Sequence, residues 1–235
     1  MSRGLGEAPG PLFRLGNLDK KQDKSTEELV FAHRFIPSEE RPEPMTLLLL
    51  HGTGGDENDL LQLGQELSPS AALLSPRGRL LENGAPRFFR RTAEGVFDTE
   101  DLIFRTHELA GFLDAASRAY GFDANRLVAV GYSNGANIAA SLLLLHPKSL
   151  ASAILFRPMM PFLPEKLPDL SRTGVLIESG LRDKIVPPEQ PKQLLDLFSR
   201  SHADAILHWE ESTHTLAEPE VLFAKDWISR LKFQG

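Results

Sequence analysis

The sequence predicts a doubly wound α/β sandwich, in which a mostly parallel β-sheet is covered by helices on both faces. Stretches with the pattern of strands alternate with helical stretches along almost the whole chain. Parallel strands need crossover connections, and a helix is the usual one. The strand expected at 45–50 is a continuous apolar run, which is typical of a strand buried on both faces. Because ligands in such sheets bind beyond the carboxyl ends of the strands, we expect the functional site there.

The 235 residues fit one domain, expected over 26–235 and preceded by a flexible tail rich in Gly, Pro, Lys and Asp over 1–25. The first strand alternates in pattern and is expected to be an edge or antiparallel strand. Strands are predicted at 29–36, 45–50, 71–74, 126–130, 152–156, 174–178 and 203–209. Helices are predicted at 56–67, 100–120, 136–146, 189–201 and 219–231, and residues 77–99 and 157–168 are expected to be irregular.

The composition excludes several kinds of site. The chain has no cysteine, which excludes disulfides, thiolate catalysis and cysteine–zinc sites. Its formal net charge of -6 argues against nucleic acid as a partner. The first residues lack the apolar core of a signal peptide, and the most apolar runs are too short to span a bilayer. We therefore expect a cytoplasmic protein without a membrane span.

The motif Gly-Tyr-Ser-Asn-Gly at 131–135 is the most informative feature of the chain. It lies between an apolar run with the pattern of a buried strand and a stretch with the pattern of a helix. This is the context of a nucleophile elbow, a sharp strand-to-helix turn that exposes a serine hydroxyl. The glycines relieve crowding in such a turn because they lack a Cβ atom. Ser133 is therefore the candidate nucleophile.

A serine nucleophile needs a histidine as base and a carboxylate that orients the base. In this context the expected chain order is serine, acid, histidine. His214 lies in a predicted loop after the last strand, whereas the other histidines after the serine lie in or at the ends of regular elements. Asp183, in the loop after a strand, is the preferred acid, and Glu178, at the end of that strand, is its rival. The alternative for Asp183 is a carboxylate that caps the next helix. The alternative for His214 is a histidine on a surface loop without a catalytic role.

The oxyanion of an acyl-transfer reaction needs two preorganised N–H donors. One is expected from Asn134, which follows the candidate nucleophile. The second is assigned to the N–H of Thr53, in a glycine-rich stretch that follows the buried strand 45–50. His51, in the same stretch, is expected to hold its shape through hydrogen bonds. The alternative is an ordinary strand–helix turn.

Four blocks of sequence resemble the phospholipase/carboxylesterase family of α/β-hydrolases. They are Leu-His-Gly-Thr-Gly-Gly-Asp-Glu at 50–57, Gly-Tyr-Ser-Asn-Gly-Ala-Asn at 131–137, Ile-Leu-Phe-Arg-Pro at 154–158 and Gly-Leu-Arg-Asp at 180–183. Residues 86–91 and 94–98 most resemble a bacterial subgroup linked to quinone and hydroquinone stress. The resemblance runs from about 29 to 232 and implies an α/β-hydrolase fold, hydrolysis of carboxylic esters, no metal and no organic cofactor. The chain departs from the family at Lys184 and Thr213, where proline and glycine are more common.

Arginines gather in one part of this acidic chain, at Arg77, Arg79, Arg87, Arg90 and Arg91. They predict either a site for a substrate carboxylate or phosphate, or ion pairs on a solvated face with Glu94, Asp98, Glu100 and Asp101. The second interpretation is preferred, because most surface charges have no further role. Three apolar side chains near the expected site predict an acyl-binding wall, with ordinary core packing as the alternative: Met159, Met160 and Phe162. Phe89 is expected either to line the substrate pocket or to hold the irregular segment in place.

The function predicted from these residues is a serine carboxylesterase that hydrolyses small to medium acyl esters through an acyl-enzyme. Two alternatives stay open. One is a thioesterase or lysophospholipase that acts on longer acyl chains, and the other is a catalytically idle hydrolase fold that binds a small ligand. The expected partner is a small ester, and a homodimer is the one protein assembly kept open.

Overall fold

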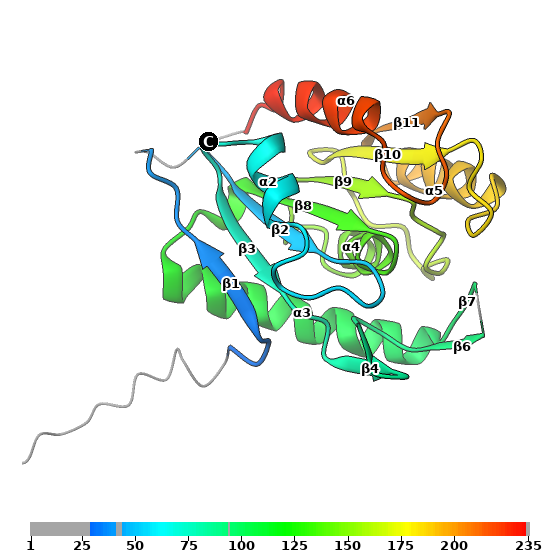
Figure 1. Ribbon diagram of the computed structural model, residues 1–235, viewed down its shortest axis with the longest axis horizontal. Helices are drawn as coiled ribbons and strands as arrows, with labels where there is room; N and C mark the ends of the chain where they lie inside the picture. Colours follow the sequence, from blue (N-terminus) through cyan, green and yellow to red (C-terminus); the bar gives the residue numbers. More distant parts are fainter. Residues whose placement is uncertain (1–28, 41–43, 94, 234–235) are drawn as a thin grey trace, which may run out of the picture.

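The computed structural model describes residues 29–40, 44–93 and 95–233, so the predicted tail lies outside the described residues. A seven-stranded sheet, in the order β1-β3-β2-β8-β9-β10-β11, crosses the molecule (Figure 1). β1 pairs antiparallel with β3, and every other neighbouring pair in this sheet is parallel, as predicted. The strands are β1 (His33–Ile36), β2 (Thr46–Leu50), β3 (Ala72–Pro76), β8 (Leu127–Tyr132), β9 (Ser152–Phe156), β10 (Gly174–Gly180) and β11 (Asp204–Glu210).

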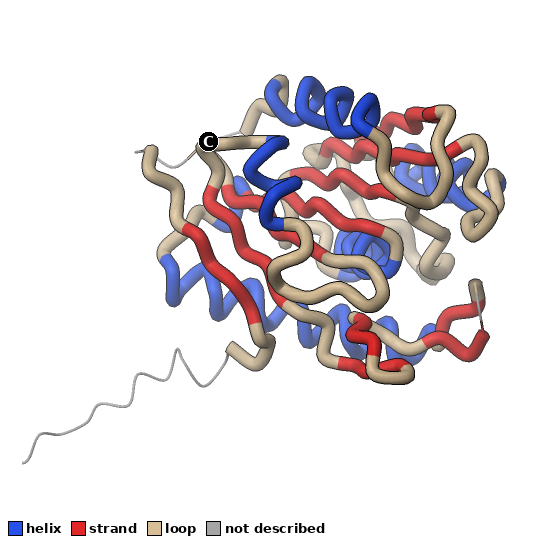
Figure 2. Tube along the Cα trace, in the orientation of Figure 1, coloured by secondary structure: helices blue, strands red, loops and turns tan. Residues whose placement is uncertain are grey.

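Helices cover both faces of the sheet (Figure 2). Side chains of β2 alternate between the faces: Leu47 and Leu49 pack in one apolar cluster, and Leu48 and Leu50 pack in the other. The first cluster includes residues of α2 (Leu61–Leu67) and α6 (Glu218–Ser229). The second includes residues of α3 (Thr99–Tyr120), α4 (Asn134–Leu145) and α5 (Glu189–Arg200). The continuous apolar run of β2 is thus explained by a helical layer on each side.

The helix predicted at 56–67 is shorter than expected, because α2 begins at Leu61. The side chain of Asp56 accepts a hydrogen bond from the N–H of Asn58 (2.7 Å), which favours a turn over a first helical turn. The helix predicted at 100–120 is confirmed as α3. Its first turn is capped by the side chain of Asp98, and Gly121 ends it with a φ of 74°.

The segment 77–99 is not irregular, which corrects the sequence prediction. It forms two hairpins, β4 (Leu80–Glu82) with β5 (Ala85–Arg87), and β6 (Arg91–Ala93) with β7 (Val96–Phe97). The first hairpin turns at Asn83 and Gly84, whose φ angles are 53° and 83°. Asn-Gly is the preferred pair for a two-residue turn with positive φ at both positions, so the sequence held a signal for this hairpin.

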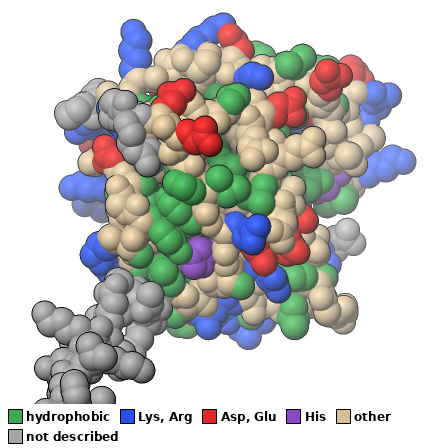
Figure 3. Space-filling model, turned by 60° about the vertical axis from the view of Figure 1, so that its left-hand side comes forward, with side chains coloured by type: hydrophobic (Ala, Val, Ile, Leu, Met, Phe, Trp, Pro, Cys, Tyr) green, Lys and Arg blue, Asp and Glu red, His purple; other side chains and the backbone are tan. Residues whose placement is uncertain are grey.

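The β1 side of the molecule carries a patch of hydrophobic side chains among charged ones (Figure 3). An aromatic cluster lies where β1 meets the end of α3. The ring of Phe35 stacks on Tyr120 with centroids 4.2 Å apart, and His33 Nε2 lies 2.6 Å from the Tyr120 hydroxyl. Of the helices within the described residues, none combines the length and apolar character that crossing a bilayer requires.

The carboxyl ends of four strands meet at one edge of the sheet. Tyr132 at the end of β8 is in register with Phe156 at the end of β9, and Gly180 of β10 is in register with Glu210 of β11. The segments that follow these strands therefore begin close together. They hold Ser133, Arg157, Asp183 and His214.

Candidate active site

Ser133 lies in the sharp turn between β8 and α4, with a φ of 51° and a ψ of -112°. Such a backbone conformation costs a non-glycine residue about 1–3 kcal/mol and persists where the surroundings enforce it. Two glycines make the turn sterically feasible. A Cβ on Gly135 would lie 1.9 Å from the carbonyl oxygen of Leu50, and one on Gly131 would lie 2.7 Å from the Cα of Ala136. The Gly-x-Ser-x-Gly pattern is thus a steric requirement of this turn.

The three side chains expected to act together lie in a continuous line of hydrogen bonds. His214 Nε2 is 3.0 Å from Ser133 Oγ, and His214 Nδ1 is 2.8 Å from Asp183 Oδ2. If the ring carries its proton on Nδ1, that nitrogen donates to the carboxylate and Nε2 accepts from the serine hydroxyl. This is the arrangement that a serine nucleophile and its base require.

The side chain of Asp183 makes two sets of contacts, but it does not cap α5, which begins without a side-chain cap. Its Oδ1 accepts hydrogen bonds from the backbone N–H groups of Ile185 (2.8 Å) and Val186 (3.1 Å), ahead of α5. Its Oδ2 faces His214. The side chain is almost fully buried, so these backbone donors fix the carboxylate in the orientation that the imidazole meets.

The loop that carries His214, residues 211–217 and here the histidine loop, is held by Arg157. The Nε of Arg157 donates to the carbonyl of Thr213 (2.8 Å), and its Nη2 donates to the carbonyl of Thr215 (3.3 Å) and to the Ser212 hydroxyl (2.9 Å). These bonds fix the backbone on both sides of the histidine. The carbonyl of His214 itself accepts a hydrogen bond from the hydroxyl of Tyr132 (3.1 Å).

Arg157 is fully buried and so needs a partner for its charge. Glu220 on α6 supplies it: the side chains approach to 2.5 Å, and Glu220 is also fully buried. The Nε of Arg157 is 3.9 Å from Asp183 Oδ2. Arg157 was identified from sequence only as part of a block that resembles the family, and its role was missed. The one available signal was its position directly after a predicted strand, where functional residues of such sheets gather.

Glu178, the rival acid, lies in a different part of the structure. Its Oε2 is 2.8 Å from His208 Nδ1 on β11, and its Oε1 is buried without a hydrogen-bond partner. Burial, with the nearby charge of Glu220, raises the pKa of Glu178 to about 9. The carboxyl is therefore protonated at neutral pH and does not face His214.

The glycine-rich loop, residues 51–55, is fixed by His51 as predicted from sequence. His51 Nε2 accepts from the N–H of Gly78 (2.9 Å), so Nδ1 carries the proton and donates to the carbonyl of Gly52 (2.6 Å). Burial lowers the pKa of His51, which favours this neutral form. The loop is further tied to the first hairpin, because the N–H of Gly54 donates to the carbonyl of Pro86 (2.9 Å).

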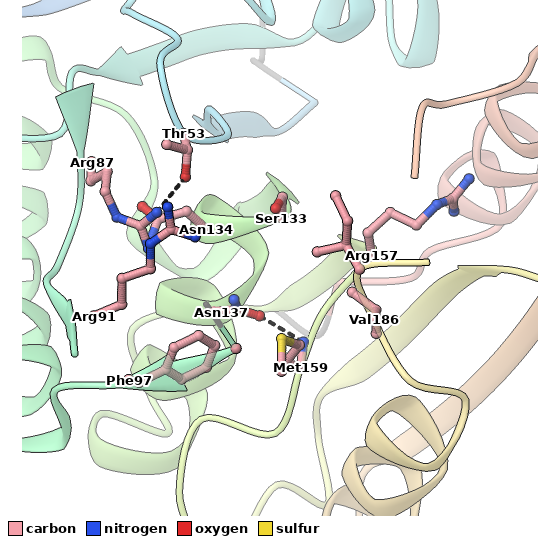
Figure 4. Close-up of a pocket in the computed structure, with 12 residues that line it drawn as sticks. Thr53, Arg87, Arg91, Phe97, Ser133, Asn134, Asn137, Arg157, Met159 and Val186 are labelled. Carbon is pink, nitrogen blue, oxygen red and sulfur yellow. Dashed lines mark hydrogen bonds between the residues drawn. The ribbon is translucent and has the colours of Figure 1, made fainter. Parts of the chain in front are cut away.

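A small cavity of about 50 Å³ opens beside Ser133 (Figure 4). Thr53 and Asn134, the two expected oxyanion donors, both line it. So does Met159, which the sequence assigned to the substrate, and Phe97 forms a further apolar part of the wall. A single water needs roughly 10–15 Å³, so the cavity has room for a few atoms only.

The structure does not bring the other three expected substrate contacts to this cavity. Phe89 is fully buried and packs edge-on against Phe97, with ring centroids 5.1 Å apart. Met160 lines a separate groove on the surface beside α5. Phe162 packs against the main apolar core. All three side chains support neighbouring structure, which was the alternative considered for them.

The arginine cluster forms ion pairs, but mostly not with the expected acids. Arg90 does pair with Asp98 (3.2 Å) and Asp101 (3.5 Å). The others pair with glutamates that were not among the expected acids; Glu57 and Glu108 are distant in sequence from their arginines, whereas Glu82 lies within the arginine segment itself. The pairs are Arg77 with Glu57, Arg79 with Glu108, and both Arg87 and Arg91 with Glu82. Glu94 lies outside the described residues.

The expectation of a solvated face is wrong for Arg87. This residue is only 4% exposed and donates hydrogen bonds to the Thr53 hydroxyl (2.7 Å) and the carbonyl of Phe89 (3.2 Å). Arg87 and Arg91 both line the cavity beside Ser133. Within the part of the chain that the structure describes, no three acidic or histidine side chains are grouped as metal ligands would be.

Both a family profile and a known protein of similar sequence match this chain. The sequence profile of the dienelactone hydrolase family matches residues 102–226. MhqD of Bacillus subtilis (strain 168), which is named as a hydrolase, is 48% identical over 181 residues, or 77% of this chain and 90% of that protein. These matches confirm the family resemblance expected from the sequence.

Two solved carboxylesterase structures share the fold. That of Bacillus cereus is 47% identical, with a TM-score of 0.83 over 86% of this chain and 94% of the other. That of Mesorhizobium loti is 32% identical, with a TM-score of 0.79 over 86% of this chain and 95% of the other. The predicted α/β-hydrolase fold is thereby confirmed.

Replacing Arg157 tests its hold on the histidine loop. Arg157→Lys keeps the positive charge but loses the planar fork that reaches Thr213 and Thr215 at once. We expect the kcat for p-nitrophenyl acetate to fall on the order of 100-fold with little change in KM, because a misplaced histidine slows the chemical step. Arg182→Lys is the control, since Arg182 also contacts this loop but is exposed. Equal kcat in the folded Arg157→Lys protein would contradict the role.

The buried Glu178 predicts a pH dependence of stability. Its raised pKa means that its contribution is fully present below the ordinary pKa of 4.5 and is lost as the pH rises towards 9. Each pH unit in this window costs up to about 1.4 kcal/mol, or roughly 3–5 °C in Tm for a chain of this size. Glu178→Gln removes the titrating group, so we expect a smaller fall in Tm between pH 5 and pH 9.

The exposed Glu39 provides the matched control for this measurement, because Glu39→Gln makes the same chemical change at the surface. Thermal unfolding followed by circular dichroism gives Tm for the parent and both variants across the pH range. A parent-like pH dependence in Glu178→Gln would show that this carboxyl does not hold its proton at neutral pH.

Proposed function

Because the chain belongs to the dienelactone hydrolase family, we propose that it is a serine carboxylesterase that hydrolyses small to medium acyl esters. The family and the similar solved structures make it a carboxylesterase-like hydrolase. The observation that carries the finer proposal is the hydrogen-bonded line from Ser133 through His214 to Asp183. The fixed glycine-rich loop and the cavity beside the serine support it further.

The proposed reaction begins when His214 Nε2 removes the proton of Ser133 Oγ and this oxygen attacks the ester carbonyl. The backbone N–H groups of Thr53 and Asn134 stabilise the oxyanion, and Asp183 stabilises the imidazolium. The intermediate collapses, the C–O bond to the alcohol breaks, and His214 gives its proton to the leaving oxygen. Water then attacks the acyl-enzyme with His214 as base, which releases the acid and restores the serine.

The small cavity favours short acyl groups. Its volume of about 50 Å³ is bounded by the apolar side chains of Phe97 and Met159. A long acyl chain needs a larger apolar channel, so the thioesterase or lysophospholipase alternative has less support. The catalytically idle alternative also has less support, because His214 lies within hydrogen-bond distance of both Ser133 and Asp183.

Removal of the nucleophile tests the proposed chemistry. We expect Ser133→Ala to lower the kcat for p-nitrophenyl acetate by about a millionfold, because serine and histidine act as one unit. A fluorophosphonate probe should label the parent and not the variant. Ser149→Ala is the control, since that hydroxyl bonds only to a turn carbonyl at the other end of α4. If parent and Ser133→Ala proteins hydrolyse the ester equally, the proposal fails.

Met159 is expected to limit the length of the acyl chain. Met159→Ala enlarges the cavity, so the ratio of kcat/KM for p-nitrophenyl octanoate to that for the acetate should rise roughly tenfold or more. The neighbouring Met160→Ala provides a matched control because Met160 lines a different groove. Rate measurements over an acyl-length series check this prediction. Similar shifts in both variants would mean that Met159 does not bound the acyl site.

A further inference from the structure

A second hollow, here the loop groove, lies between the glycine-rich loop and the histidine loop. Residues between 52 and 60 line it together with Tyr132, Thr215 and Leu216. Its volume is about 260 Å³, against about 50 Å³ for the cavity beside Ser133. The loop groove therefore has room for a group much larger than the cavity can take.

The loop groove and the cavity lie on opposite faces of the sheet. Leu60, Tyr132 and Leu216 of the groove pack in the apolar cluster that includes residues of α2 and α6. Phe97 of the cavity packs against the other cluster. Thr53, whose N–H is a proposed oxyanion donor, lines both hollows. A substrate that reaches both of them therefore crosses the proposed oxyanion site.

The loop groove lies on the side of the leaving alcohol. His214 protonates this alcohol in the proposed reaction, and the next residue, Thr215, lines the groove. The rings of His214 and Tyr132 lie with their centroids 5.6 Å apart. Because the cavity takes the acyl group in the proposed function, the loop groove is the hollow that is left for the alcohol.

The carboxylate of Asp59 is the one charged group among the described residues that line the loop groove. A Cβ on Gly55 would lie 2.2 Å from Asp59 Oδ2, so the glycine allows this carboxylate to lie against the glycine-rich loop. No hydrogen bond or ion pair joins the carboxylate to another residue that the structure describes. Glu57, by contrast, pairs with Arg77. The negative charge in the groove is therefore available to a ligand.

An aromatic ring lines the same groove. The ring of Tyr132 lies against Gly52, where a Cβ would be 2.8 Å from its Cδ1, and the hydroxyl donates to the carbonyl of His214 (3.1 Å). These contacts fix the ring. Aromatic rings attract cations and are a common means of binding quaternary ammonium groups, and a nearby carboxylate adds a Coulombic attraction.

We infer that the loop groove binds the alcohol part of the substrate, and that Asp59 and Tyr132 select alcohols that carry an ammonium group, such as choline. The inference rests on the proposed function, because it assigns the leaving group of the proposed ester. A cation fits the groove and not the cavity, because the charged side chains that line the cavity are all arginines. The two hollows thus differ in charge as well as in volume.

A matched pair of substrates tests the inference. Acetylcholine and neohexyl acetate share the acyl group and the shape of the alcohol, but a carbon replaces the cationic nitrogen in the second. Each kcat/KM is divided by the rate of alkaline hydrolysis of the same ester, which removes the difference in leaving-group reactivity. We expect the parent protein to favour acetylcholine, and Asp59→Asn to lower that preference roughly two- to fivefold, the effect of one exposed ion pair.

Asp56→Asn is the matched control. It removes one negative charge from the same segment, but Asp56 does not line the loop groove and contacts Asn58 instead. Its preference for acetylcholine should equal that of the parent. The inference is overturned if the parent shows no preference, if Asp59→Asn keeps the preference in full, or if Asp56→Asn loses it as fully as Asp59→Asn.

Salt provides a readout that a merely structural role of Asp59 would not move. An increase in ionic strength from about 0.01 M to about 1 M shortens the Debye length from roughly 30 Å to roughly 3 Å. The preference of the parent for acetylcholine should fall over this range, and that of Asp59→Asn should change less. Equal salt dependence in the two proteins would remove the Asp59 charge from the explanation.

Binding separates this inference from the proposed function. An NMR titration of Ser133→Ala protein measures the affinity for choline and for neohexanol without any turnover. We expect choline to bind more tightly, and the added Asp59→Asn change to weaken it. If the parent hydrolyses no ester, the proposed function fails while this titration still decides whether the groove takes a cation. Equal affinity for choline and neohexanol would overturn the inference.

Discussion

One buried cation, the guanidinium of Arg157, joins the segments that meet at the carboxyl end of the sheet. Removal of such a charge from water costs several kcal/mol, which its partners must offset. Those partners are Glu220 on α6, the carbonyl of Glu178 on β10, and groups on both sides of His214 in the histidine loop. If the loop moved away from the sheet, Glu220 would still balance the charge, but buried N–H groups of Arg157 would lose their acceptors at Ser212, Thr213 and Thr215. The position of the histidine is therefore fixed by the hydrogen-bonding requirement of a buried cation.

The same backbone conformation occurs directly after two neighbouring strands. Ser133 after β8 and Arg157 after β9 both have positive φ, at 51° and 57°. Each donates its N–H to the last part of the next strand: Ser133 to the carbonyl of Phe156, and Arg157 to that of Glu178, both at 2.8 Å. The pairing of parallel strands thus enforces two strained residues. One directs a hydroxyl towards the cavity, and the other directs a guanidinium into the interior beneath the histidine loop.

The sequence was sufficient for features that depend on local pattern and chain order. Apolar periodicity predicted the sheet and its helical layers, and the order serine, acid, histidine selected residues that the fold brings together. Contacts between segments that lie far apart in the sequence could not be predicted from local pattern. The partner of Glu178 depends on the register that places it opposite His208 on β11, and the role of Arg157 depends on a helix more than 50 residues downstream. The Asn83-Gly84 turn is different, since its signal was present in the sequence.

The contrast between the acidic chain and its basic cavity follows from the range over which charges act. The formal net charge of -6 is spread over the protein, and at physiological salt its field is screened within about 8 Å. Inside the cavity, Arg87 is almost fully buried, so its charge is screened far less. The charged side chains that line the cavity are Arg87, Arg91 and Arg157, so the local charge there differs from the average charge of the molecule. The formal net charge therefore describes the molecule as a whole and gives no guide to the charges around Ser133.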